Sequence, residues 1–243
     1  MDAVSFITRS ADHHYTFEGV TYPGVTSILK VIDKSDALMA WASRMTAEAA
    51  IAMSGTLGAL IETVGQDGAV KALTARSSWK RDEAAALGTE IHRLADLLVT
   101  GQDLPELGDL TRAYVEGYAK WWTASEWRVR ASEAMLVNPE RGYGGTLDLL
   151  CYDGDGRTVL ADIKTGRGVY KEVALQLAAY SMAEWLQAGD ALYQMPAVDR
   201  YVVLHVTREG VREIELNAGD TERKAFRACI TLAAWRDTMK GKL

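Results

Sequence analysis

Hydrophobic positions recur with two different periods along the chain, and the change of period separates a helical stretch from one rich in strands. Between about residues 35 and 125, apolar residues return every three or four positions, as in "RDEAAALGTEIHRLADLLVTG" and "LGDLTRAYVEGYAKWWTASEW". This spacing predicts amphipathic helices, the first of them ending at Gly101. Ahead of the helices, "HYTFEGVTYPGV" alternates around Glu18-Gly19 and predicts a small hairpin.

From about residue 127 the period becomes two, which predicts strands. The five predicted strands are "WRVRASEAMLV", "YGGTLDLLCY", "RTVLADIKT", "RYVVLHVT" and "GVREIEL". A helix, "VYKEVALQLAAYSMAEWLQ", separates the third strand from the fourth, and a last helix is expected from about Asp220 to Lys240. This order predicts an α/β or α+β domain with a central mixed β-sheet flanked by helices.

Composition and charge narrow the class of protein. The chain has 243 residues, 48% of them hydrophobic and 25% charged, which fits one well-buried domain. No apolar run approaches the ~20 residues that cross a bilayer, and the start "MDAVSFITRSADHH" lacks the order of a signal peptide. We therefore expect a cytoplasmic protein with no membrane partner. A net charge of -6 argues against coating nucleic acid by bulk electrostatics but allows a basic groove.

Two of the predicted strands carry charges where a buried strand should carry none. Asp148 lies within "YGGTLDLLCY", and Asp162 and Lys164 lie within "RTVLADIKT". The strands are joined by "DGDG", a strong turn signal, so they should pair as antiparallel neighbours. A solvent-facing edge with a surface salt bridge is the alternative, but the flanking "LDLLCY" and "VLADI" are too apolar for two exposed strands.

The register of this hairpin decides whether the charges meet. If Gly154-Asp155-Gly156 forms a three-residue loop, Asp148 lies opposite Asp162, and opposed residues share one face of the sheet. A two-residue loop would set Asp148 against Ala161 and send the carboxylates to opposite faces. In the first register the two Cβ atoms are ~5 Å apart, and Lys164 shares their face because side chains alternate.

Two carboxylates at that spacing repel each other unless a cation lies between them, and one lysine neutralises only one of the two. A divalent cation with oxygen ligands, Mg²⁺ or Mn²⁺, is the natural partner. Lys164 is then available to stabilise a developing negative charge or to help activate a water. The hairpin therefore predicts a metal-dependent active site.

Four short motifs in a fixed order carry a resemblance to a known family. They are "GTEIH" (88–92), "GTLD" (145–148), "DIK" (162–164) and "QLAAY" (176–180). Over roughly residues 80 to 190 the chain resembles the RecB-like exonuclease branch of the PD-(D/E)XK nuclease superfamily. The resemblance implies a restriction-endonuclease-like core and hydrolysis of a DNA phosphodiester by a metal-activated water attacking in line at phosphorus.

Carried over by position, the resemblance implies that Asp148 and Asp162 are metal ligands, together with the main-chain carbonyl of Ile163. Lys164 would be the catalytic lysine, and His92 an additional metal ligand. By pattern alone His92 is equally typical of a core or surface residue, because it lies on a helix among Ile91 and leucines.

Three further side chains are site candidates. Gln176 and Tyr180 lie one helical turn apart and project together, and a glutamine on that apolar stripe needs a hydrogen-bond partner. In the family this pair lies beside the active site. Glu133, which alternates with Ala131 and Met135, matches a glutamate often found there, although a plain salt bridge is the competing interpretation. Asp96, one turn beyond His92, either orients the imidazole or is solvated.

Departures from the family pattern limit which cofactors and partners we expect. Some relatives hold an iron-sulfur cluster with four cysteines, but this chain has two, Cys151 and Cys229, so no cluster is expected. It carries no sequence of the form GxxxxGK[ST] and so no motor of its own. The resemblance to small exonucleases of phage recombination implies DNA as substrate, a single-strand annealing protein as partner, and a bacterial or phage-infected cell. Formation of a homo-oligomer stays open.

The sequence thus predicts a single nuclease domain over 1–243, with a mainly helical N-terminal region (1–80) and a PD-(D/E)XK core (81–243). The favoured function is a Mg²⁺- or Mn²⁺-dependent DNA exonuclease in recombination or repair. A structure-selective endonuclease with the same site, or a catalytically silent DNA-binding subunit, are the alternatives. Intact Asp148, Asp162 and Lys164 weigh against the silent subunit, since such charges are costly to bury.

Overall fold

The predicted N-terminal hairpin is present, paired across Glu18-Gly19, in a computed structural model that describes residues 6–166 and 168–239. Its strands are β2 (His14–Phe17) and β3 (Val20–Pro23), and a short β1 (Thr8–Arg9) pairs with β2 to make a three-stranded sheet in the described residues. Tyr15 and Phe17 alternate inward and are buried with Ile7 against Val137. The hairpin therefore packs on the main sheet.

The chain divides into two units, one comprising Asp33–Thr89 and the other comprising the residues before and after it. The first unit contains α2 (Ser35–Ala52) and the beginning of α3 (Leu57–Val99), whose helical backbone is interrupted at Gly65 with φ 75°. The last part of α3, from Glu90 onward, belongs to the second unit. None of the described helices is long and apolar enough to cross a membrane.

The second unit is built on a mixed sheet of seven described strands in the order β10-β9-β6-β5-β4-β7-β8. β6 and β9 pair in parallel, and the other neighbours pair antiparallel. The strands are β4 (Arg128–Asn138), β5 (Tyr143–Tyr152), β6 (Thr158–Lys164), β7 (Trp185–Ala188), β8 (Ala191–Gln194), β9 (Arg200–Thr207) and β10 (Gly210–Glu215). The central β6 is buried along almost its whole length, as a strand between two covered faces should be.

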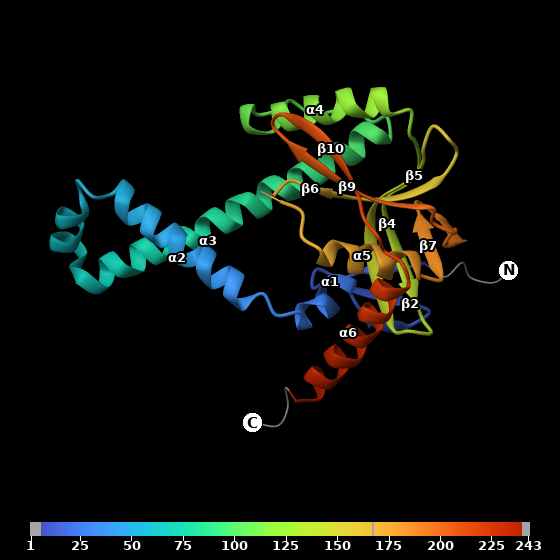
Figure 1. Cartoon of the computed structure of the whole chain (residues 1–243), viewed down its shortest axis with the longest axis horizontal. Helices are drawn as coiled ribbons and strands as arrows, with labels where there is room; N and C mark the ends of the chain where they lie inside the picture. The colour runs from blue at the N-terminus through green and yellow to red at the C-terminus, as the bar shows by residue number, and fades with distance from the viewer. Residues whose placement is uncertain (1–5, 167, 240–243) are drawn as a thin grey trace. The chain divides into compact units, whose positions relative to one another are not determined.

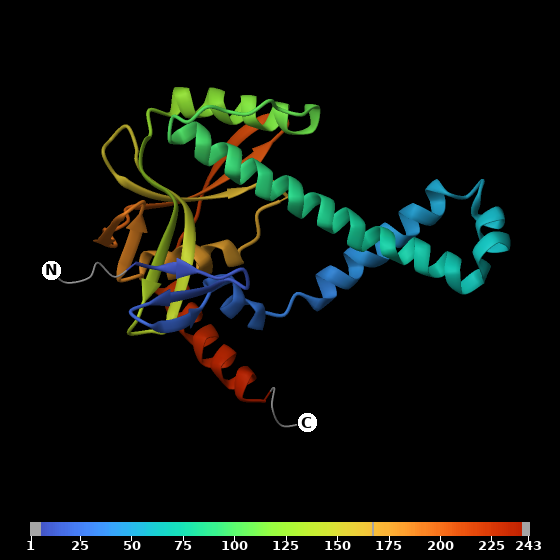
Figure 2. The same cartoon turned by 180° about the vertical axis from the view of Figure 1, so that it is seen from behind.

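Helices cover both faces of this sheet, as Figures 1 and 2 show from opposite sides. α4 (Asp109–Ser125) contacts β9 and β10, whereas α5 (Glu172–Ser181) contacts β6 and β9 and packs on α6 (Asp220–Met239). The short α1 (Val25–Ile28) and η1 (Leu29–Val31) join α5 and α6 in a core that includes Leu150, Leu160 and Phe226. The predicted mixed sheet flanked by helices is confirmed.

One predicted element is wrong. The helix expected to run to Gln187 ends at Ser181, and Trp185–Ala188 forms β7 instead. β7 pairs with β4, where Leu136 lies opposite Leu186, and with β8. The apolar spacing continues past Ser181, but hydrogen bonds to β4 are available there and extend the sheet by two strands that the sequence pattern did not indicate.

The β5–β6 hairpin has the register that brings the acidic residues together. Leu149 lies opposite Ala161 and Tyr152 opposite Thr158, so the same register continued by one step sets Asp148 opposite Asp162. At the other end, the amide of Asp153 donates to the carbonyl of Arg157 (3.0 Å), which closes a three-residue loop. The prediction of that loop is confirmed.

The turn end of the hairpin contains a buried carboxylate. Asp153 Oδ2 accepts from Arg157 Nε (2.9 Å) and Arg200 Nη1 (3.0 Å), while its Oδ1 accepts from the backbone amides of Asp155 and Arg157. Arg200 also contacts Glu215 (3.0 Å). Burial raises the pKa of Asp153, but these hydrogen bonds and charges outweigh it and hold the pKa below its usual value. The carboxylate is therefore fully compensated.

Two adjacent glycines in β5 make room for aromatic rings. A Cβ at Gly144 would lie 2.5 Å from Cβ of Tyr15, and a Cβ at Gly145 would lie 2.6 Å from Cε1 of Tyr180. Any side chain at either position would displace its ring. Tyr15 also shares a hydrogen bond with Thr146 through the two hydroxyls (2.9 Å). The N-terminal hairpin and α5 are thus both fitted to the strand that carries Asp148.

Candidate active site

The predicted site residues come from five elements and meet within the unit that contains the sheet. Asp148 lies on β5, Glu133 on β4, and His92 on the last part of α3. The others are Asp162, Ile163 and Lys164 on β6 and Gln176 and Tyr180 on α5. The hydrogen bonds and ion pairs described next connect all of them into one cluster.

Asp162 is the most enclosed acid of the cluster, with 1% of its surface exposed. Its Oδ2 makes an ion pair with Lys164 Nζ (2.5 Å), and its Oδ1 accepts from Gln176 Nε2 (2.8 Å). The Gln176 amide also donates to the hydroxyl of Tyr180 (3.0 Å). The hydrogen-bond partner that a buried glutamine requires is therefore the predicted acid itself, and α5 fixes the position of that acid.

Asp148 is held from two sides. Its Oδ2 accepts from the backbone amide of Ile163 (2.6 Å) and lies 3.5 Å from Nδ1 of His92. The amide of Ile163 thus orients one acid of the pair, while Lys164 on β6 and Gln176 on α5 hold the other. The Ile163 side chain is buried, and the role of its carbonyl as a metal ligand stays a prediction.

Glu133 reaches the cluster because the β4–β5 register, with Ser132 opposite Leu149 and Ala134 opposite Leu147, sets it opposite Asp148. Its φ is 45°, in the left-handed region that a glutamate rarely occupies within a strand. Its carboxylate lies 3.8 Å from Nδ1 of His92. Among the described residues, ligand atoms of His92, Glu133 and Asp148 all lie within 4.8 Å of one another, a spacing that could hold one metal ion. Backbone strain of this kind is typical of functional positions.

The electrostatics show a site that attracts cations. Burial disfavours the protonation of His92, but Asp148, Glu133 and Asp162 outweigh it and raise the pKa of the imidazole to about 10. Burial and the charge of Asp148 raise the pKa of Asp162 to about 6, against the opposing effect of Lys164. Burial alone would lower the pKa of Lys164. Asp162 and Asp148 together have the larger effect and raise that pKa above its usual value, so the ammonium stays charged.

The structure bears on one residue whose role the sequence left open and contains one that the sequence interpretation missed. Asp96 makes no hydrogen bond or ion pair with His92 among the described residues, so nothing there supports an orienting role. His205 on β9 was missed, although it interrupts an apolar strand just as Asp162 does. It lies beside Lys164 in the parallel pairing, is 8% exposed, and donates from Nε2 to the carbonyl of Gly166 (2.7 Å).

The residues present fit a divalent cation. An imidazole nitrogen beside carboxylate oxygens is a donor set that suits Mn²⁺ and, with fewer protein ligands, Mg²⁺. Asp148 and Glu133 face His92 with no ion pair to lysine or arginine among the described residues. Cys151 and Cys229 are both buried as free thiols, in β5 and α6.

A mixed sheet with paired acids, a lysine and a histidine at neighbouring strands defines a metal-dependent hydrolase of the restriction-endonuclease-like class. The chain matches the family model of the PD-(D/E)XK nuclease superfamily over residues 50–241, and it belongs to that superfamily. Comparison with curated proteins gave no match. Membership implies a metal-dependent nuclease.

Proposed function

We propose that this protein is a Mg²⁺- or Mn²⁺-dependent DNA exonuclease of the RecB-like branch that acts in recombination or repair. The observation that carries the proposal is the meeting of Asp148, Asp162 and Lys164, on the buried β5–β6 hairpin, with His92 of α3. The order of the motifs, and the Gln176–Tyr180 pair bonded to Asp162, support the RecB-like branch. A single-strand annealing protein as partner belongs to the same proposal.

The chain's own residues have separate tasks in this reaction. His92, Glu133, Asp148, Asp162 and the Ile163 carbonyl would hold the metal, which supplies charge stabilisation to the phosphate oxygens. Lys164 places an ammonium next to the acids, where it stabilises the negative charge that develops as water attacks phosphorus. Gln176 keeps Asp162 in place through its hydrogen bond (2.8 Å).

The test compares linear and covalently closed circular duplex DNA, each incubated with the protein and Mg²⁺, Mn²⁺ or EDTA. We expect metal-dependent loss of the linear DNA alone. The Lys164→Ala variant serves as the control for contaminating nuclease and should be inactive. Cutting of the circle would replace the exonuclease with an endonuclease. Absence of cleavage of either DNA by the wild type would instead support a silent DNA-binding subunit.

A further inference from the structure

A row of three basic side chains crosses the sheet from the active site to its edge. In the parallel pairing of β6 with β9, Lys164 lies beside His205, and in the antiparallel pairing of β9 with β10, His205 lies beside Arg212. Residues paired side by side in a sheet point to the same face. Lys164, His205 and Arg212 therefore share the face that carries Asp162.

His205, in the middle of this row, and Arg212, at its outer end, differ in their exposure to solvent. His205 is buried, and its Nε2 is occupied by the carbonyl of Gly166 (2.7 Å), so it holds the chain that follows Lys164. Arg212 is exposed and makes no ion pair within residues 6–166 and 168–239. A guanidinium with no carboxylate partner beside an acidic site is available to an anion from outside.

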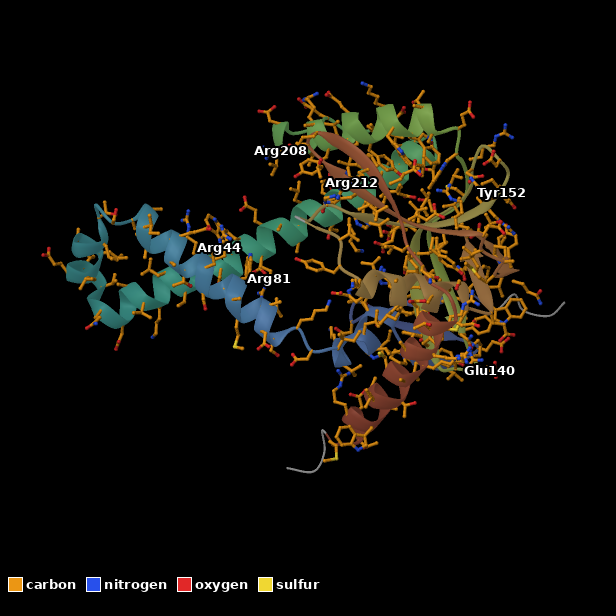
Figure 3. All side chains as sticks on the ribbon, in the orientation of Figure 1. Arg44, Arg81, Glu140, Tyr152, Arg208 and Arg212 are labelled. Atoms are coloured by element: carbon orange, nitrogen blue, oxygen red, sulfur yellow. The ribbon has the colours of Figure 1, made fainter. Side chains whose placement is uncertain are left out.

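The acids of β10 do not compensate Arg212, because they point the other way. Glu213 accepts from Trp121 Nε1 (3.1 Å) on α4, and Glu215 contacts Arg200 (3.0 Å). Both alternate with Arg212 along the strand and so lie on the opposite face. Arg208, in the β9–β10 turn, lies beside Glu209, whose pKa is lowered mainly by a hydrogen bond with Thr207 and to a lesser extent by the charge of Arg208. Figure 3 labels Arg208 and Arg212 on this hairpin.

We infer that Arg212 binds a backbone phosphate of the nucleic-acid strand a few nucleotides from the one that is cut. This inference rests on the proposed function, and it assigns the direction in which that strand crosses the sheet. Two strand spacings separate β6 from β10, about 10 Å. At a rise of about 3.4 Å per nucleotide, this distance corresponds to about three nucleotides of one strand. The substrate is therefore a polynucleotide that extends over β9 and β10.

The test measures how DNA binding depends on salt. Fluorescence anisotropy of a labelled duplex is recorded in EDTA, which prevents cleavage, over a series of KCl concentrations. For Arg212→Ala we expect about fivefold weaker binding at low salt. The slope of log affinity against log salt should fall in magnitude by about 0.9, the value for one phosphate contact. Arg212→Lys keeps the charge and should retain the wild-type slope.

Arg128 provides a matched control. It is also an exposed arginine on a strand, but it lies on β4 opposite Tyr152, away from the β9–β10 hairpin, as the Tyr152 label in Figure 3 shows. Arg128→Ala should bind with the wild-type slope. An unchanged slope in Arg212→Ala, while wild-type protein still cuts linear DNA with Mn²⁺, would overturn the inference and leave the proposed function intact. Wild-type protein that neither binds nor cuts DNA would overturn both.

Discussion

The two ends of the β5–β6 hairpin both bury an aspartate, yet they treat it in opposite ways. At the turn, Asp153 accepts hydrogen bonds from two arginine side chains and two backbone amides, and these hold its pKa below the usual value. At the other end, Asp162 faces a second aspartate, and its pKa rises to about 6 in spite of Lys164. The same residue type, at the two ends of one hairpin, is stabilising in one place and destabilising in the other.

The difference separates structural charge from functional charge. A buried acid whose hydrogen bonds are all satisfied holds the turn together and needs nothing from solution. A cluster with more acids than cations is tolerated only if a ligand supplies the missing positive charge. His92, whose pKa is raised to about 10 by its acidic neighbours, supplies some of that charge. Removal of one basic residue from each end is therefore the sharpest test of the comparison.

The largest expected effect contrasts Lys164→Ala with Arg200→Ala. Loss of the ammonium beside Asp162 should lower the cleavage rate by about 10²–10³-fold, because charge stabilisation in the transition state is removed. Loss of Arg200 should leave cleavage by the folded protein intact but destabilise the turn by about 2 kcal/mol, since Asp153 loses a buried partner. Cleavage assays and thermal melts of both variants measure this.

The melting temperature of Arg200→Ala should fall by about 5 °C for that loss of stability. Lys164→Ala should remain folded by circular dichroism. If Arg200→Ala lost cleavage as completely as Lys164→Ala did at a temperature where it is folded, the two ends would not be functionally distinct.

A smaller effect is expected for Asp162→Asn. Its affinity for Mn²⁺ should fall by about tenfold or more, as measured by isothermal titration calorimetry. Its melting temperature in EDTA should be no lower than that of the wild type at pH 7, because an acid whose folded pKa is raised is destabilising when ionised. A variant that binds Mn²⁺ normally would remove Asp162 from the metal site.

The smallest effect is the pH dependence of the turn. The folded pKa of Asp153 lies below its unfolded value, so its contribution to stability is fully present above about pH 4 and is lost as pH falls through the folded pKa. Asp153→Asn lacks this contribution. The free energy of unfolding of the two proteins, from urea melts, should differ most near neutral pH and converge once the pH has fallen below the folded pKa of Asp153. A difference that stayed constant down to that pH would contradict the assignment.

The sequence could predict the hairpin and its register because both depend on neighbours in the chain. Turn residues follow Tyr152 directly, and alternation then places Asp148 and Asp162 on one face. The four motifs of the resemblance also depend on short spacing alone. For this reason the site residues on β5, β6 and α5 could be selected before any fold was known.

The remaining features could not be read from the sequence because distant segments determine them. β7 becomes a strand only because β4, about 50 positions earlier, offers it hydrogen bonds at Met135 and Leu136. The left-handed backbone of Glu133 is imposed by its surroundings, since no local signal favours φ 45° at a glutamate. Arg200 and His205 acquire their partners from the turn and from Gly166 only after the sheet has formed.

The close contacts of aromatic rings with Gly144 and Gly145 also affect the order in which segments of the chain can pack together during synthesis. Tyr15 and its hydrogen-bond partner Thr146 are 131 positions apart. At about 5–20 residues per second, a ribosome needs roughly 7 to 26 seconds after adding Tyr15 to reach Thr146. The N-terminal hairpin must wait through that interval with Tyr15 and Phe17 uncovered. The hairpin that contains Tyr15 therefore docks only after β5 has been made, and a chaperone that shields apolar segments would act during that interval.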